Sequence, residues 1–184
     1  MEISKRCFRR ILMIGLGGML LCPGIALASG ADVGEALSGE EILEFSARYA
    51  DDEAGSMVAR SALEFVGTAY SQEMRYSEHY VDCSSFVERA LRKAEISLGG
   101  TAAEQARQCV ENGMAIEPAQ AAAGDVVFWK KPNCHCGRFM EIHHVGIYLG
   151  DGRVVEASSG KGGIVVRDIW ETSEWNIAFY ARVY

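Results

Sequence analysis

The chain of 184 residues is long enough for one domain, and its 49% hydrophobic and 23% charged residues allow a folded core rather than a disordered chain. Its formal net charge of −7 is poorly suited to holding DNA, RNA or anionic lipid through bulk electrostatics. Nucleic acid is therefore excluded as an expected partner.

The first 28 residues are typical of an export signal peptide. Four basic residues precede an apolar run at residues 11–21, and residues 26–28 supply the small side chains that a signal peptidase recognises. The run is shorter than the ~20 residues of a membrane span, so we expect cleavage, a secreted or cell-envelope location, and no stable span afterwards. Arg9-Arg10 leaves open a twin-arginine signal, and Cys22 a lipoprotein signal.

Cleavage would make the remaining chain more acidic. It would remove four of the 18 basic and one of the 25 acidic residues, which leaves a formal charge of −10. Residues 29–55 are then predicted to form a linker and a short N-terminal helix. Within this segment Ser38 and Glu41 have the spacing of a capping box, which indicates where the helix begins.

Three more helices are predicted before the strands. Residues 56–66 carry apolar side chains at helical spacing, and Gly67 follows as a stop. The next helix has Asp82 as N-cap, so Cys83 lies in its first turn and points with the buried side chains. A last helix begins at Thr101 and ends near residue 113.

From residue 124 onward the pattern changes to short β-rich runs separated by Gly, Asp and Asn. The runs lie at residues 126–129, 145–149, 153–157, 164–167 and 177–183. Helices first and strands later predict an α+β domain over residues 56–184, with N-terminal helices packed on an antiparallel sheet of about five or six strands. Residues 130–142 are predicted to form a longer loop.

Cys83 is a candidate nucleophile because unpaired N–H groups and the dipole at a helix N-terminus favour the thiolate form. A lone cysteine is more often a small buried hydrophobe, so a base is also required. His143 and His144 both precede a strand, and alternation places His144 on the same face as Gly146. A glycine there would let the helix that carries Cys83 approach, so we predict that His144 is the base.

The third member of the set depends on the turn at residues 150–152. A three-residue hairpin loop would place Glu156 opposite Gly146 and on the face of His144. A two-residue loop would place Glu156 on the other side. The sequence leaves both possibilities open.

Three motifs in this order resemble the NlpC/P60 family of cell-wall cysteine peptidases. They are DCSSFV at residues 82–87, GDVVF at 124–128 and HVGIY at 144–148. The likeness extends over residues 57–184 and implies a papain-like core. It also implies that Cys83 is acylated by the substrate, that His144 is its base and that the Cys83 backbone N–H stabilises the oxyanion.

The resemblance extends to other positions of the site. Glu156 matches the third polar residue, commonly His, Asn or Gln in the family, and a carboxylate there would hold the tautomer of the imidazole. Tyr70 matches a tyrosine beside the thiol, and Asp82 and Ser84 match positions that bind the free amine of the substrate. The Trp-Gly-Gly stretch of the family is replaced by residues 71–81, and the glycine after its motif serine is Ser85.

The implied activity is that of an exported peptidoglycan hydrolase, a cysteine endopeptidase that cleaves stem peptides at the γ-D-glutamyl-diamino acid bond. It needs no cofactor, and we expect a monomer. Two alternatives stay open, because a fold of this kind serves several functions. One is an N-acetylmuramoyl-L-alanine amidase-type cysteine hydrolase, and the other is a non-catalytic cell-wall-binding or secretion component.

A second group of cysteines lies outside these motifs. Cys134 and Cys136 flank His135, with His143 and Cys109 nearby in the sequence. One Cys-x-Cys pair is weak evidence for zinc, so no metal site is predicted. An exported compartment permits disulfides, and a bond from Cys109 to one of the other two is the preferred hypothesis.

Overall fold

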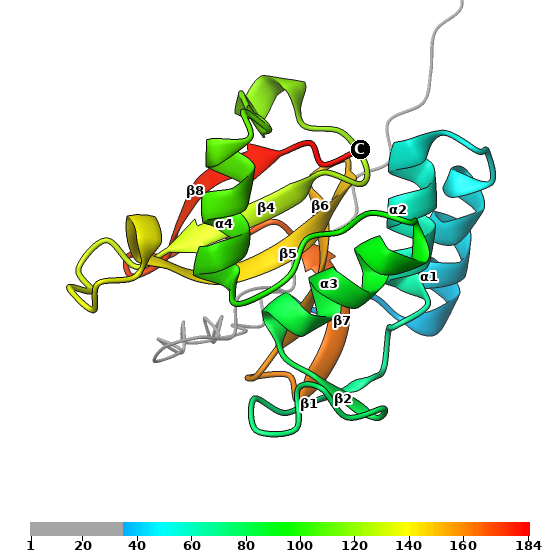
Figure 1. The fold of residues 1–184 in the computed structure, drawn as a ribbon. Coiled ribbons are helices and arrows are strands. Elements are labelled where there is room, and N and C mark those ends of the chain that lie inside the picture. The colour runs from blue at the N-terminus through cyan, green and yellow to red at the C-terminus, as the bar shows by residue number, and fades with distance from the viewer. Residues whose placement is uncertain (1–34) are drawn as a thin grey trace, which may run out of the picture. The chain divides into compact units, whose positions relative to one another are not determined.

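The computed structural model describes residues 35–184 (Figure 1). The predicted signal peptide at residues 1–28, and the linker residues up to 34, lie outside the described residues. The α-helices are α1 (Gly39–Ser46), α2 (Ala54–Leu63), α3 (Cys83–Lys93) and α4 (Ala102–Glu111). Short 3-10 helices are η1 (Ala47–Tyr49), η2 (Pro118–Gln120) and η3 (Phe139–Glu141).

The helices begin where their capping residues predict. Ser38 with Glu41, and Thr101 with Glu104, form reciprocal capping boxes at α1 and α4. The second helix differs from its prediction at both ends: α2 begins at Ala54 and ends at Leu63. After Leu63 the backbone N–H groups of Phe65 and Val66 donate to the oxygens three residues before them, and that of Gly67 donates to the oxygen of Ile164. The apolar pattern of this stretch resembles that of a helix, but its hydrogen bonds are not those of an α-helix.

The sheet contains eight strands in the described residues, in the order β2-β1-β7-β6-β5-β4-β8-β3. The long strands are β4 (Val126–Lys130), β5 (Ile142–Gly150), β6 (Arg153–Ser158), β7 (Gly163–Asp168) and β8 (Asn176–Ala181). The short strands are β1 (Ala69–Tyr70), β2 (Tyr80–Val81) and β3 (Ala115–Ile116). The α+β class is confirmed, but about five or six strands was too low, because a two-residue strand shows no alternation in the sequence.

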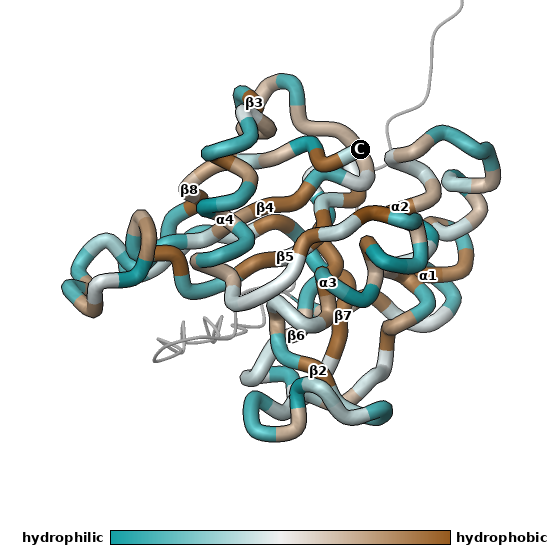
Figure 2. Tube along the Cα trace, viewed as in Figure 1, coloured by the Kyte–Doolittle hydropathy of each residue, from teal (hydrophilic) through white to brown (hydrophobic). Residues whose placement is uncertain are grey.

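Among the described strands, all pairings are antiparallel except that of β1 with β2. Helices α3 and α4 lie against β5, and α2 packs on α3 (Figure 1). The main core lies between these helices and the sheet, and it includes Phe86 and Leu91 of α3 and Val145 and Ile147 of β5. Figure 2 shows apolar residues along the central strands such as β4. This packing anchors the start of α3 beside the sheet.

The short N-terminal helix belongs to the same core. Phe45 and Tyr49 are buried, and the Tyr49 hydroxyl donates to the backbone oxygen of Leu149 in β5. Just before α1, the backbone N–H of Leu37 donates to the oxygen of Val166 at 2.8 Å. The described part of the predicted linker segment therefore packs on the sheet.

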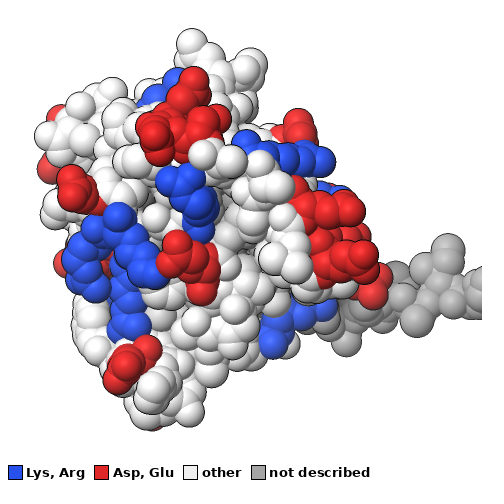
Figure 3. All heavy atoms as spheres, turned by 90° about the vertical axis from the view of Figure 1, so that its right-hand side faces the viewer, with Lys and Arg blue, Asp and Glu red and all other residues white. Residues whose placement is uncertain are grey.

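The surface in Figure 3 carries charges of both signs. Clusters of Lys and Arg lie beside clusters of Asp and Glu on this face, so it presents no extended field of one sign. Within residues 35–184, no helix combines the length and apolar character that crossing a membrane requires.

Candidate active site

Cys83 is the first residue of α3, where the N–H groups of the first turn have no partner within the helix. Asp82 Oδ1 accepts from the backbone N–H of Ser85 at 2.8 Å, and the Asp82 N–H donates to Ser85 Oγ at 2.9 Å. Ser85, which replaces a family glycine, therefore completes the cap. The Cys83 thiol is half-buried, so it combines a polar helix end with access to solvent.

The structure brings Cys83 and His144 together from distant parts of the chain. The two side chains lie beside each other where α3 begins, close enough for Cys83 to help raise the pKa of His144. On its other side, His144 Nε2 contacts Oε2 of Glu156. Because Nε2 faces the carboxylate, Nδ1 is the ring nitrogen left for the sulfur. The three predicted side chains thus lie in one line of contact.

His144 lies beside Cys83 as predicted, but not because Gly146 lets the helix that carries Cys83 approach. Val145 and Ile147 of β5 belong to the core beneath α3. Gly146 lies between them in the strand and therefore faces the opposite side of the sheet. A Cβ added at Gly146 would lie 3.0 to 3.2 Å from atoms of β6, so the missing side chain admits a neighbouring strand. The contact of His144 with Cys83 at the start of α3 therefore does not depend on Gly146.

The turn between β5 and β6 settles the position of Glu156. It has two residues, Asp151 and Gly152, both in the left-handed region with φ of 48° and 72°. A bulge at the end of β5 shifts the register and supplies the residue that a longer loop would have added. Glu156 therefore lies across from Gly146, on the side of His144.

Glu156 is fully buried, and both of its oxygens have partners. Oε1 contacts the guanidinium of Arg167 in β7 and accepts from Trp170 Nε1 at 3.0 Å, while Oε2 faces His144. Burial would raise the pKa of Glu156, but His144 and Arg167 together hold it below its ordinary value. Arg167 and Trp170 were not among the predicted site residues. The one signal for Arg167 was that a charged residue stands inside a predicted strand.

The charge of His144 follows from this arrangement. Burial is the largest effect and would lower its pKa, but the Glu156 carboxylate and the hydrogen bonds with Cys83 and Glu156 raise it to about 10. The imidazolium is therefore favoured at neutral pH. A cation beside a thiol stabilises the thiolate, which is the nucleophilic form.

Three tryptophans that the sequence did not assign to the site surround the imidazole. The ring centroids of Trp129, Trp170 and Trp175 lie 5.3, 6.0 and 6.2 Å from that of His144. Trp129 Nε1 donates to the backbone oxygen of Trp170 at 2.7 Å, which ties two of the rings together. The His144 side chain is 13% exposed as a result, so its orientation is fixed and little water reaches it.

The predicted substrate-binding residues lie beside the thiol, and two of them are already engaged. Tyr70 is near Cys83 and Asp82, since both, after burial itself, contribute to raising its pKa. Asp82 forms an ion pair with Arg75 at 3.0 Å, and Arg75 Nη2 donates to Ser84 Oγ at 3.0 Å. A substrate ammonium would have to share or displace this guanidinium, which comes from the segment that departs from the family pattern.

The described cysteines are all free thiols. Cys109 is fully buried in α4, and burial raises its pKa to about 12. The preferred hypothesis of a disulfide from Cys109 is therefore wrong for this structure, because the other two cysteines lie on the loop before β5, where neither is fully buried. Cys134 and Cys136 instead meet His143.

A thiol at the start of a helix, facing a histidine on an antiparallel sheet that a buried carboxylate holds, defines the papain-like class of α+β fold. Within that class, the model of the NlpC/P60 family matches residues 67–181. The chain belongs to this family, and the resemblance drawn from its three motifs is confirmed.

Known relatives share the matched region. The chain is 35% identical over 112 residues to "Bifunctional muramidase/DL-endopeptidase CwlT" of Bacillus subtilis, a match that covers 61% of this chain and 31% of the relative. It is 31% identical over 124 residues to "Peptidoglycan DL-endopeptidase CwlO" of Bacillus licheniformis, with 67% and 25% covered. "Probable endopeptidase NlpC homolog" of Haemophilus influenzae is 29% identical over 122 residues, with 66% and 55% covered. The match thus spans about a quarter to about half of these relatives.

Solved structures agree on the fold. The NlpC/p60 domain of peptidoglycan hydrolase SagA aligns with a TM-score of 0.54 and 25% identity, covering 70% of this chain and 97% of that one. NlpC1 from Trichomonas vaginalis aligns with a TM-score of 0.61 and 20% identity, covering 72% and 45%. The second likeness is one of fold alone.

Proposed function

We propose that this chain is a cysteine peptidase that hydrolyses stem peptides of peptidoglycan. The observation that supports the proposal most directly is the line of contact from Cys83 through His144 to the buried Glu156. The names of the relatives, two of which are DL-endopeptidases, support a γ-D-glutamyl-diamino acid bond as the bond that is cut.

The reaction we propose has two steps. The Cys83 thiolate attacks the scissile carbonyl carbon, and the backbone N–H of Cys83 donates to the oxyanion. The His144 imidazolium gives its proton to the leaving amine as the C–N bond breaks, which leaves an acyl-enzyme. His144 then takes a proton from water, whose oxygen attacks the acyl carbon and releases the carboxylic product and the thiolate.

Glu156 has a positioning role in this proposal, because it touches the imidazole and not the reacting carbonyl. It holds the ring in one orientation and favours the imidazolium. Arg167 and Trp170 in turn fix the carboxylate. The surrounding tryptophans keep water from the ring on the side away from the thiol.

The proposed binding position for the substrate amine differs most from the family pattern. Asp82 and Ser84 are proposed to lie near the free amine, with Tyr70 lining the same groove. Arg75 neutralises Asp82, so we propose that this chain depends less on a free substrate amine than the family pattern implies.

A location outside the cytoplasm belongs to the proposal as well. Peptidoglycan is an extracytoplasmic substrate, and the pattern of residues 1–28 supports export. N-terminal sequencing of the protein isolated from culture medium or envelope tests this. A mature chain that still begins at Met1 would contradict it.

Digestion of purified peptidoglycan tests the activity. Wild type should release fragments that carry new amino groups on a diamino acid, and Cys83→Ala should release none. Cys109→Ala, which also removes one sulfur but lies in the core of α4, is the matched control and should remain active. A free lactyl group among the products would indicate the amidase instead. The absence of products from wild type would favour the non-catalytic alternative.

A further inference from the structure

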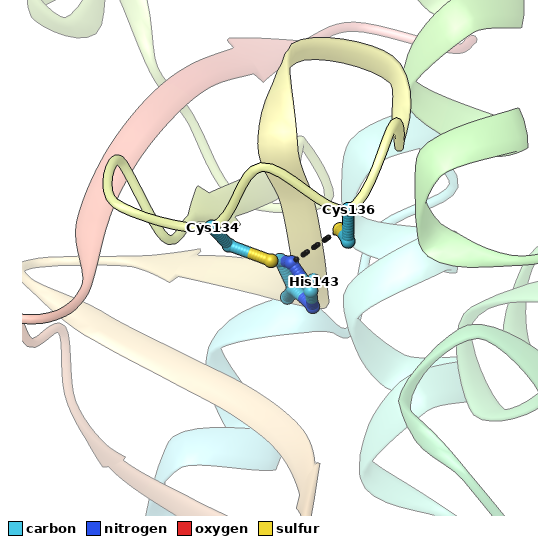
Figure 4. A group of neighbouring side chains, drawn as sticks. All are labelled: Cys134, Cys136 and His143. Carbon is cyan, nitrogen blue, oxygen red and sulfur yellow. Dashed lines mark hydrogen bonds between the residues drawn. The ribbon is translucent and has the colours of Figure 1, made fainter.

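Three possible metal ligands converge at the base of the loop between β4 and β5. Cys134 and Cys136 come from the loop, and His143 is the second residue of β5. One ligand atom from each lies within 4.8 Å of the others, and Cys136 Sγ is 3.4 Å from His143 Nε2. Figure 4 shows both sulfur atoms turned toward the imidazole.

We propose that Cys134, Cys136 and His143 form a site for a soft transition metal ion, with Zn²⁺ as its occupant. Zinc binds thiolate at about 2.3 Å and imidazole at about 2.0 to 2.1 Å, so tetrahedral geometry places two ligand atoms roughly 3.5 to 3.8 Å apart. The separation of Cys136 and His143 is close to this. Sulfur and imidazole ligands exclude Mg²⁺ and Ca²⁺, which prefer oxygen.

The backbone of the loop is shaped to make this convergence. The N–H of Lys131 donates to the oxygen of Glu141 at 3.0 Å and closes the base of the loop. Gly137 turns the chain at a φ of 77°, and Met140 and Glu141 have φ of 49° and 56°. Positive φ at residues other than glycine costs energy and persists where the surrounding structure requires it. A bound ion would be such a requirement.

Three protein ligands leave a fourth coordination position. Cys136 is exposed, so this position faces solvent and can take a water molecule. The site is separate from the proposed catalytic thiol, since Cys83 is not among its ligands. A bound ion would join the loop to β5 through these three ligands.

The site nevertheless adjoins the proposed active site. His143 precedes His144 in β5, and the ring of Trp175 lies edge-on to both, with centroids 6.2 Å away in each case. Lys131, at the base of the loop, lies over the same tryptophan at 4.3 Å. An ion that fixes His143 would thus also limit the movement of Trp175, which helps to enclose the proposed catalytic base.

Metal binding can be measured without any assay of activity. The full chain is reduced, freed of metal with a chelator, incubated with Zn²⁺ alone and separated from unbound ion by gel filtration. Elemental analysis should find one equivalent of zinc. Replacement of zinc by Co²⁺ should give the thiolate-to-cobalt charge-transfer absorption of a site with sulfur ligands.

The variants separate this site from other histidines and thiols. Cys134→Ser, Cys136→Ser and His143→Gln should each lose the equivalent of zinc while keeping the circular dichroism of the fold. His135→Gln is the matched control: its exposed ring lies within the same loop, 3.5 Å from Glu141, and outside the ligand group. Cys109→Ala is the control for a remote thiol. Both controls should keep the metal.

Three results would overturn the proposal. The first is reduced wild type that retains no zinc after gel filtration. The second is His143→Gln with the same zinc content as wild type. The third is a Cys134–Cys136 disulfide in the isolated protein whose reduction does not restore zinc binding. Loss of peptidoglycan hydrolysis is not among the readouts, so failure here is distinguishable from failure of the proposed function.

Discussion

Replacing Glu156 with glutamine removes a buried charge while keeping the shape of the side chain. Glu156 is fully buried, and its carboxylate contacts both Arg167 and His144. Removing one partner of a buried ion pair costs about 3 to 5 kcal/mol. The amide oxygen can still accept a hydrogen bond from Trp170, as Oε1 does at 3.0 Å. We therefore expect Glu156→Gln to lower the free energy of unfolding by about 3 kcal/mol, the lower end of that range.

The effect should depend on pH in one direction. The folded-state pKa of Glu156 lies below its ordinary value of 4.5, so its charge contributes stability that is fully present above 4.5. That contribution is lost as the pH falls through the folded-state pKa. The difference in stability between wild type and Glu156→Gln should be full near neutral pH and should shrink below 4.5.

Urea unfolding followed by far-ultraviolet circular dichroism, at neutral pH and at about pH 3.5, measures both effects. Asp168→Asn is the matched control, because it removes a carboxylate whose side chain is 70% exposed and whose pair with Arg153 lies at the surface. It should change stability by less than about 1 kcal/mol. The reasoning is refuted if Glu156→Gln costs no more than this control, or if the difference from wild type grows as the pH falls.

Three further substitutions and treatments have expected outcomes. Gly146→Ala should cost about 1 to 3 kcal/mol in urea unfolding and lower the rate of peptide hydrolysis, because the new Cβ would lie 3.1 Å from the Val155 oxygen; an unchanged stability would contradict the packing. Arg75→Met should raise kcat/KM for a stem peptide with a free amine about tenfold over its N-acetylated form, since Asp82 is then open to the ammonium. A loss for both peptides alike would assign Arg75 a structural role. A thiol reagent at about pH 8 should modify Cys109 only as fast as the protein unfolds, because burial raises the pKa of that thiol to about 12. Mass spectrometry measures the labelling, and labelling of Cys109 faster than unfolding would contradict this expectation.

The sequence carried the parts of the fold that local chemistry determines. The capping pairs at Ser38 and Thr101, and the five long strands, follow from side-chain patterns within a few residues. The pairing of Cys83 with a histidine on a strand could be predicted as well, because the order of the motifs implied it. Strands β1 and β2 could not be predicted, since a strand of two residues shows no alternation of apolar and polar side chains.

The remaining parts of the site depend on contacts between distant segments. Arg75 and Arg167 contact their carboxylate partners only once the loop and the sheet have formed. No neighbouring residue in the sequence indicates which carboxylates these are. The convergence of His143 with the loop cysteines likewise depends on backbone turns with positive φ. Long-range geometry of this kind is absent from a local pattern.

Because of the bulge beside the β5–β6 turn, the number of residues in this hairpin matters as much as the identity of the residues that follow it. An odd or even number decides which face of the sheet each residue of β6 takes. Deleting a single residue there would present Val155 or Ala157 to the imidazole and turn Glu156 toward the helices, since a strand exposes alternate residues on each face. A hairpin that touches no substrate thus sets the composition of the proposed catalytic group. Length variants in this turn should be selected against as strictly as replacements of the thiol.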